Sequence, residues 1–122
     1  MIDVFIESRY RVNRKKIREE AARFLEKMGV SPLLYDFSIA IVGDRKMKSL
    51  YLKHKGKNET TPVLSFLINE KVKDENGERS LIGEIVISYP QVLLFASEEN
   101  KLIEKKIGEF VEHGLTSLLT EN

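Results

Sequence analysis

Side chains that could do chemistry recur along one helical stripe near the end of the sequence. Glu109, His113 and Ser117 are four residues apart, with Glu112 beside them, so on a helix they would project from one side. Two ligands at this spacing are what a metal-binding helix requires. A serine hydroxyl is a poorer zinc donor than imidazole, however. His113 is therefore either a metal ligand or an ordinary packed or hydrogen-bonded helix histidine.

Two residues outside that helix also qualify as site residues. Glu84 lies in the apolar segment Gly83-Glu84-Ile85-Val86-Ile87, where a carboxylate must face either solvent or a polar cleft. Lys55 lies in His54-Lys55-Gly56-Lys57, and it is either a solvated loop cation or a phosphate contact.

The composition excludes several kinds of site. Cysteine is absent, which rules out disulfides, thiolate metal sites, iron–sulfur clusters and cysteine nucleophiles in these 122 residues. The only histidines are His54 and His113, so the chain alone cannot build a three-histidine zinc site. It also has no glycine-rich phosphate loop, dinucleotide fingerprint or Gly-x-Ser-x-Gly motif.

The charge is unevenly distributed although the net charge is only +1. Residues 1–57 hold fourteen Lys and Arg against seven Asp and Glu, whereas residues 58–122 hold six against twelve. One basic run precedes the first helix and enters it, and a second comprises Arg45, Lys46, Lys48, Lys53, Lys55 and Lys57. The second run is a candidate RNA-binding surface. The alternative is that folding interleaves these cations with the acidic half.

The length of 122 residues fits one domain spanning residues 1–122. No apolar stretch is long enough to cross a bilayer, and the N-terminal segment lacks the pattern of a secretory signal. We therefore expect a cytoplasmic protein without a membrane partner. The sequence stops inside a helical pattern without a following glycine, so we expect the domain to be short at its C-terminus, with a segment missing.

Hydrophobic periodicity predicts an α+β (mixed α/β) fold with a sheet of about four strands and three main helices. Strands are expected at residues 2–6, 37–41, 63–68 and 82–88, and helices from an Asn13 cap to Gly29, from an Asp44 cap to about Gly56, and from about Gln91 onward. The last helix has an alternative start as a separate turn before Glu98. The nearly continuous apolar strand at 63–68 predicts cover on both faces. Lys71 to Ser80, with Asn76-Gly77, is expected to be the turn of a hairpin.

Three short motifs resemble, in order, those of the YbeY family of bacterial metal-dependent endoribonucleases linked to ribosomal RNA maturation. They are Leu50, Gly56-Lys57 and Thr61 followed by Val63-Leu64-Ser65-Phe66; Gly83-Glu84-Ile85-Val86-Ile87; and His113-Gly114-Leu115-Thr116-Ser117-Leu118-Leu119. The order and spacing of elements agree from about residue 37 onward. The resemblance implies a YbeY-like fold and an rRNA maturation factor that cleaves single-stranded RNA. The alternative is a catalytically inactive RNA-binding or ribosome-associated module of the same fold.

The resemblance also implies roles for individual residues. Lys55 stands where the family has an arginine, which keeps the charge but loses the planar fork suited to phosphate. Glu84 stands for an aspartate, and both residues would be catalytic. His113 matches the first zinc histidine, Ser117 replaces the second, and the third position falls beyond the last residue. Zinc is thus the implied cofactor, and we expect this chain not to retain it. The implied partner is ribosomal RNA or the ribosome, without DNA specificity.

Overall fold

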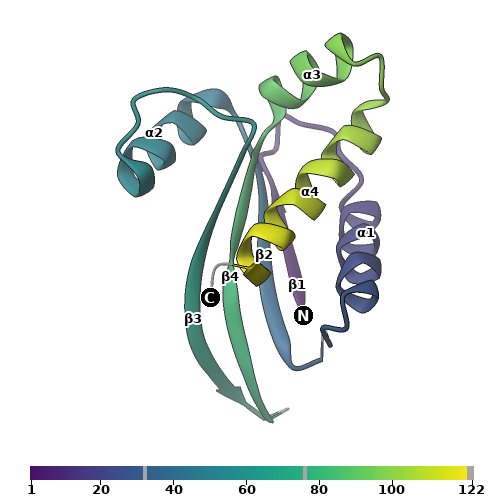
Figure 1. Ribbon diagram of the computed structural model, residues 1–122, viewed down its shortest axis with the longest axis vertical. Coiled ribbons are helices and arrows are strands. Elements are labelled where there is room, and N and C mark those ends of the chain that lie inside the picture. Colours follow the sequence, from purple (N-terminus) through teal and green to yellow (C-terminus); the bar gives the residue numbers. More distant parts are fainter. Residues whose placement is uncertain (32, 76, 121–122) are drawn as a thin grey trace.

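The computed structural model describes residues 1–31, 33–75 and 77–120, which form one four-stranded sheet and four helices (Figure 1). The elements are β1 (Ile2–Ile6), α1 (Arg14–Lys27), β2 (Tyr35–Val42), α2 (Asp44–Lys55), β3 (Val63–Asp74), β4 (Gly77–Ser88), α3 (Tyr89–Glu98) and α4 (Ile103–Thr120). The predicted α+β class is confirmed. No helix in these described ranges is both long and apolar enough to cross a membrane.

The C-terminal helical segment is divided near Glu98, as in the alternative with a separate turn, although its first part is a full helix and not a turn. It consists of two helices, α3 and α4, separated by a short connection. Asn100 in this connection has a φ of 55°, in the left-handed region that ends helices. The apolar spacing on both sides of the break is helical, and this is why the pattern reads as one continuous helix.

The strand order in the sheet is β1-β2-β4-β3. β1, β2 and β4 run parallel, and β3 pairs antiparallel with β4, which confirms the predicted hairpin. The hairpin is longer than expected, because most of the segment assigned to the turn continues the two strands as far as the pair Asp74 and Gly77. The connection is only Glu75 and Asn76, and Asn76 lies outside the described residues. Strand pairing through the backbone tolerates these polar side chains because both faces are exposed there.

The prediction that residues 63–68 are covered on both faces holds in part, because Leu64 and Phe66 pack in the α2 cluster and Val63 and Leu67 pack against the larger core, but the cover is incomplete. β3 is an edge strand in the sheet order, and within its apolar half only Leu64 is buried. Figure 1 shows why, since α2 reaches only the upper part of β3. A run of apolar residues on a partly covered edge strand looks the same in sequence as a fully covered strand.

The two faces of the sheet carry different helices. On β4, Ile85 and Ile87 belong to the larger core cluster together with α1 and α4, whereas Val86 belongs to a smaller cluster with Met47 of α2. Because neighbouring residues of a strand point to opposite faces, α2 covers one face and α1 and α4 cover the other. Glu84 shares the α2 face with Val86.

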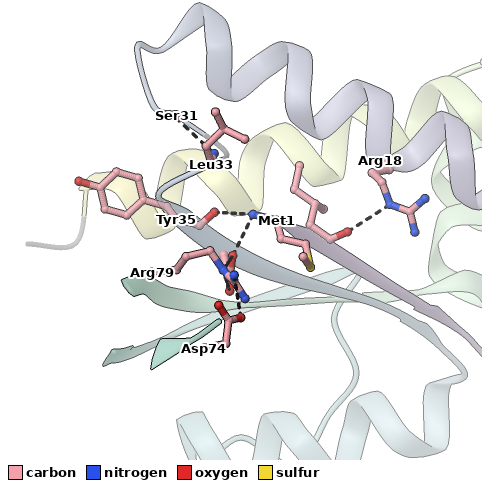
Figure 2. A network of polar contacts seen from close by, with 9 residues as sticks. Met1, Arg18, Ser31, Leu33, Tyr35, Asp74 and Arg79 are labelled. Carbon is pink, nitrogen blue, oxygen red and sulfur yellow. Dashed lines mark hydrogen bonds and ion pairs between the residues drawn. The ribbon is translucent and has the colours of Figure 1, made fainter. Parts of the chain in front are cut away.

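Polar contacts connect β1 and the β3–β4 hairpin to β2 (Figure 2). Asp36 of β2 accepts a hydrogen bond from the amino group of Met1 at 2.9 Å and forms an ion pair with Arg79 of β4 at 3.1 Å. Burial raises the pKa of Asp36. The two cationic donors lower this pKa by more than burial raises it, so the net pKa is below its usual value. On the outer side of β1, Arg18 donates to the carbonyl oxygen of Ile2 at 3.2 Å.

Candidate RNA-binding site on the α2 face

α2 begins directly where β2 ends and packs on the sheet through a narrow stripe. Its N-cap is Gly43, and it ends at Gly56, whose φ of 71° suits glycine. Met47 is fully buried, and Leu50 and Tyr51 are partly buried beside it. Apart from the partly buried Asp44, the rest of the helix is exposed, so α2 presents most of its circumference to solvent.

Asp44 does not cap α2, contrary to our expectation. It is the first helical residue, and its carboxylate accepts hydrogen bonds from Ser88 Oγ (2.7 Å), Thr60 Oγ1 (2.9 Å) and Gln91 Nε2 (3.3 Å). Burial raises its pKa, but the three donors lower it by more, so the net pKa lies below its usual value. Asp44 thus joins α2 to the segment before β3 and to the start of α3. An aspartate directly after a buried strand was the sequence signal for such a junction.

Glu84 lies on the sheet surface beside α2. In register it is opposite Phe66 on β3 and Ser38 on β2, so all three side chains share the α2 face. It is half-buried, and this burial raises its pKa, while His54 and Lys46 of α2 pull the pKa back down. Both cationic groups are therefore within electrostatic reach of the carboxylate.

His54 is a further candidate site residue, which our sequence analysis did not select. Its imidazole stacks on the ring of Phe66, with centroids 4.2 Å apart and planes 12° from parallel, and it remains exposed. Lys46, Leu50 and His54 are spaced four residues apart on α2, which places them in one row above the sheet. The signal was present in this spacing, but it pointed to Phe66 only once β3 was known to lie alongside.

The six cations of the second basic run are all exposed, and none forms an ion pair with a residue in the described ranges. They are Arg45, Lys46, Lys48, Lys53, Lys55 and Lys57. At about 3.6 residues per turn, Lys46 and Lys53 occupy one flank of α2, and Lys48 and Lys55 the opposite flank. Lys53 and Lys55 also lie in the last turn, where cations favour the helix dipole. Helix stabilisation thus explains the lysines in the last turn, but it does not explain Lys46 and Lys48.

The residues of the predicted helical stripe on α4 do not form one site, because the two glutamates contact different neighbours. The Glu109 carboxylate binds the ammonium groups of Lys101 and Lys106 at 2.8 and 3.1 Å. Glu112 shares a hydrogen bond with Glu20 of α1, which, together with burial, raises its pKa. His113 is exposed on α4, a helix that packs on the face opposite to Glu84. Glu84 is thus grouped with Lys46 and His54, and not with His113.

Fold and site together define a small α+β protein with a basic helix beside a half-buried carboxylate. Residues 4–120 match the family model described as Endoribonuclease YbeY, and the chain therefore belongs to this family. Relatives named Endoribonuclease YbeY include those of Anaeromyxobacter sp. (32% identical over 86% of this chain and 52% of the relative) and Thermodesulfovibrio yellowstonii (34%, 73% and 54%). That of Halalkalibacterium halodurans is 30% identical over 86% of this chain and 68% of the relative.

The chain spans about half the length of the first two of these relatives. The solution structure of TM1509 from Thermotoga maritima aligns with all of this chain and 74% of its own, with a TM-score of 0.63 and 24% sequence identity. This likeness supports the fold. The family-level resemblance inferred from the three motifs is confirmed.

The YbeY family is generally zinc-dependent, so the side chains that could bind a zinc ion in this chain are relevant. A structural or catalytic zinc site takes at least three nitrogen, sulfur or carboxylate ligands from the protein. Within residues 1–31, 33–75 and 77–120, no three His, Cys, Asp or Glu side chains lie close enough together to hold a metal ion. His113 with the hydroxyl of Ser117 does not fit zinc, and we assign no chemical step to the metal.

Proposed function

We propose that this chain acts in ribosomal RNA maturation as a single-strand-specific endoribonuclease of the YbeY type. The observation that carries the proposal is the α2 face, where exposed cations that form no ion pair within the described residues lie on the helix beside the half-buried Glu84 in a member of this family. Phosphate contacts need positioned cations, and a half-buried carboxylate beside them can serve as a general base. Its partners are then ribosomal RNA or the ribosome, and its place of action is the cytoplasm.

Within this proposal, Lys55 and the other five cations of the basic run hold phosphates of the RNA. Glu84 accepts a proton during cleavage. His113 is the one matching metal ligand, and the incomplete donor set leaves zinc weakly held by this chain. Chelation of metal should accordingly leave the melting temperature unchanged, because no metal contributes to folding.

A second candidate function is a catalytically inactive RNA-binding or ribosome-associated module. The observation in its favour is the position of His113, which is exposed on a helix that packs on the opposite face from Glu84. RNA binding by α2 would survive without any metal, because it depends on charge alone.

Incubation with single-stranded and double-stranded RNA of equal length separates the two functions. We expect cleavage of the single strand, a loss of roughly 100-fold or more for Glu84→Gln, and a smaller loss for Lys55→Ala. The matched control for Lys55→Ala is Lys105→Ala, which removes one exposed cation from α4. Salt-dependent binding without cleavage would favour the inactive module. A chain that binds no RNA at low salt would contradict both functions.

A further inference from the structure

We propose that His54 and Phe66 form a stacking platform for one nucleobase of single-stranded RNA, an inference that rests on the proposed RNA-directed function. The platform is the stacked pair of rings on the α2 face, and its outer ring, His54, is exposed. Aromatic rings in a basic surface are the usual means of binding single strands without reading their sequence, because every base has a π face.

The position of Phe66 makes the platform rigid. Phe66 lies on β3 opposite Glu84 and packs against the α2 cluster, so its ring is held by the sheet. His54 occupies the last turn of α2, close to the αL residue Gly56, and gains its orientation from the ring beneath it. A ring fixed on one side and exposed on the other can accept a base without a large loss of conformational entropy.

The charges around the platform indicate which part of the RNA lies there. The carboxylate of Glu84 is next to the rings, and a negative charge repels a phosphate at this point. Lys46 and Lys53 occupy the flank of α2 on the side of Glu84, since Lys46 acts electrostatically on Glu84 and Lys53 follows it seven residues later. An uncharged base over His54 avoids repulsion by the Glu84 carboxylate, and the flanking phosphates can bind the ammonium groups of Lys46 and Lys53.

Tryptophan fluorescence can report the stacking directly, because the sequence contains no tryptophan. In the variant His54→Trp, titration with decaadenylate should quench the fluorescence of the single indole. The control is Leu102→Trp, since Leu102 is 78% exposed between α3 and α4 and away from α2. Inorganic polyphosphate serves as the second ligand, because it carries phosphates without bases. It should bind and leave the His54→Trp fluorescence nearly unchanged.

Affinity measurements give a second test in the natural sequence. His54→Ala should weaken decaadenylate binding about fivefold or more, the low end of base–aromatic stacking, and should leave polyphosphate binding unchanged. His54→Phe should restore decaadenylate binding because it keeps the ring and removes the imidazole. The pair Lys46→Ala and Lys53→Ala should lower the log–log salt slope by about 1.4. The control pair Lys27→Ala and Lys105→Ala removes equal charge from exposed positions on α1 and α4, outside the basic run, and should lower it less.

The outcomes distinguish failure of the platform from failure of the proposed function. Salt-dependent binding of decaadenylate with equal quenching of both tryptophan variants, or with none, would overturn the platform and leave RNA binding in place. Equal weakening of both ligands by His54→Ala would also overturn it, because His54 would then act only as a cation. No binding of decaadenylate to the unaltered protein would overturn both proposals.

Discussion

Lys106 of α4 and the lysines of α2 lie on opposite sides of the sheet and have contrasting environments. On the side of α3 and α4, the Lys106 side chain is only 7% exposed, and its ammonium binds Glu99 at 2.8 Å and Glu109 at 3.1 Å. The same ammonium lies 4.9 Å from the ring centroid of Phe110. On the α2 face, Lys46 and Lys53 are exposed and form no ion pair with any residue that the structure describes.

This difference separates a structural use of charge from a binding use. A buried cation must be compensated within the protein, since an unpaired charge away from water is costly. An exposed cation without an acidic neighbour keeps its full attraction for an external anion. The carboxylates follow the same division, because Lys106 and Lys101 lower the pKa of Glu109, whereas burial raises that of Glu84.

The largest expected effect comes from removing the buried lysine. Lys106→Ala should lower the free energy of unfolding by roughly 2–3 kcal/mol, because Glu99 and Glu109 lose a shared partner and the apolar stem leaves a gap. Lys46→Ala should change it by less than about 0.5 kcal/mol. Urea denaturation of both variants measures the difference. Equal stability losses for the two lysines would remove the contrast between the faces.

A glycine pair within α4 gives the next largest effect. A Cβ at Gly114 would lie 2.7 Å from Cγ2 of the buried Ile85, while a Cβ at Gly108 would meet nothing closer than Glu20 Cγ at 3.5 Å. Gly114→Ala should therefore destabilise the protein by about 1–2 kcal/mol through overpacking. Gly108→Ala should stabilise it by up to about 1 kcal/mol, because alanine is the better helix former. Thermal denaturation of the two variants should move in opposite directions. A stabilised Gly114→Ala would mean that α4 can shift away from β4.

Gly114 also shows how far the sequence alone could lead. The fold followed from local signals, as with Asn13, whose side chain accepts a hydrogen bond from the Lys16 amide at 3.0 Å as a helix cap should. The motifs containing Gly83 and Gly114 marked the family. Their physical reason, the close approach of α4 to β4, depends on contacts between distant segments.

The site was less predictable for the same reason. Helical spacing predicted that Glu109 and His113 lie on one side of a helix. In the structure, the Glu109 carboxylate instead forms ion pairs with Lys101 and Lys106. The placement of Glu84 depended on which face α2 would cover, and no periodicity within one segment specifies that. His54 and Phe66 are twelve residues apart in the sequence and belong to different elements, so their stacking could be found only in three dimensions.

The smallest expected effect concerns Glu84, where stability and RNA function should oppose each other. Because burial raises its pKa in the folded state, this carboxyl stabilises the fold fully below its unfolded pKa, and that contribution disappears as the pH rises through the folded pKa. The groups that face it are His54 and Lys46 from α2, the Ser38 position on β2 and Phe66 on β3, and the two cationic groups only reduce the shift.

Glu84→Gln should therefore raise the melting temperature slightly at pH 7, and the gain over the unaltered protein should vanish near pH 4. Parallel melting curves across this range measure the difference, since the other carboxyls titrate equally in both proteins. A variant less stable than the parent at pH 7 would show that Lys46 and His54 stabilise the Glu84 carboxylate by more than burial costs, and the α2 face would then resemble the paired lysines of the opposite side.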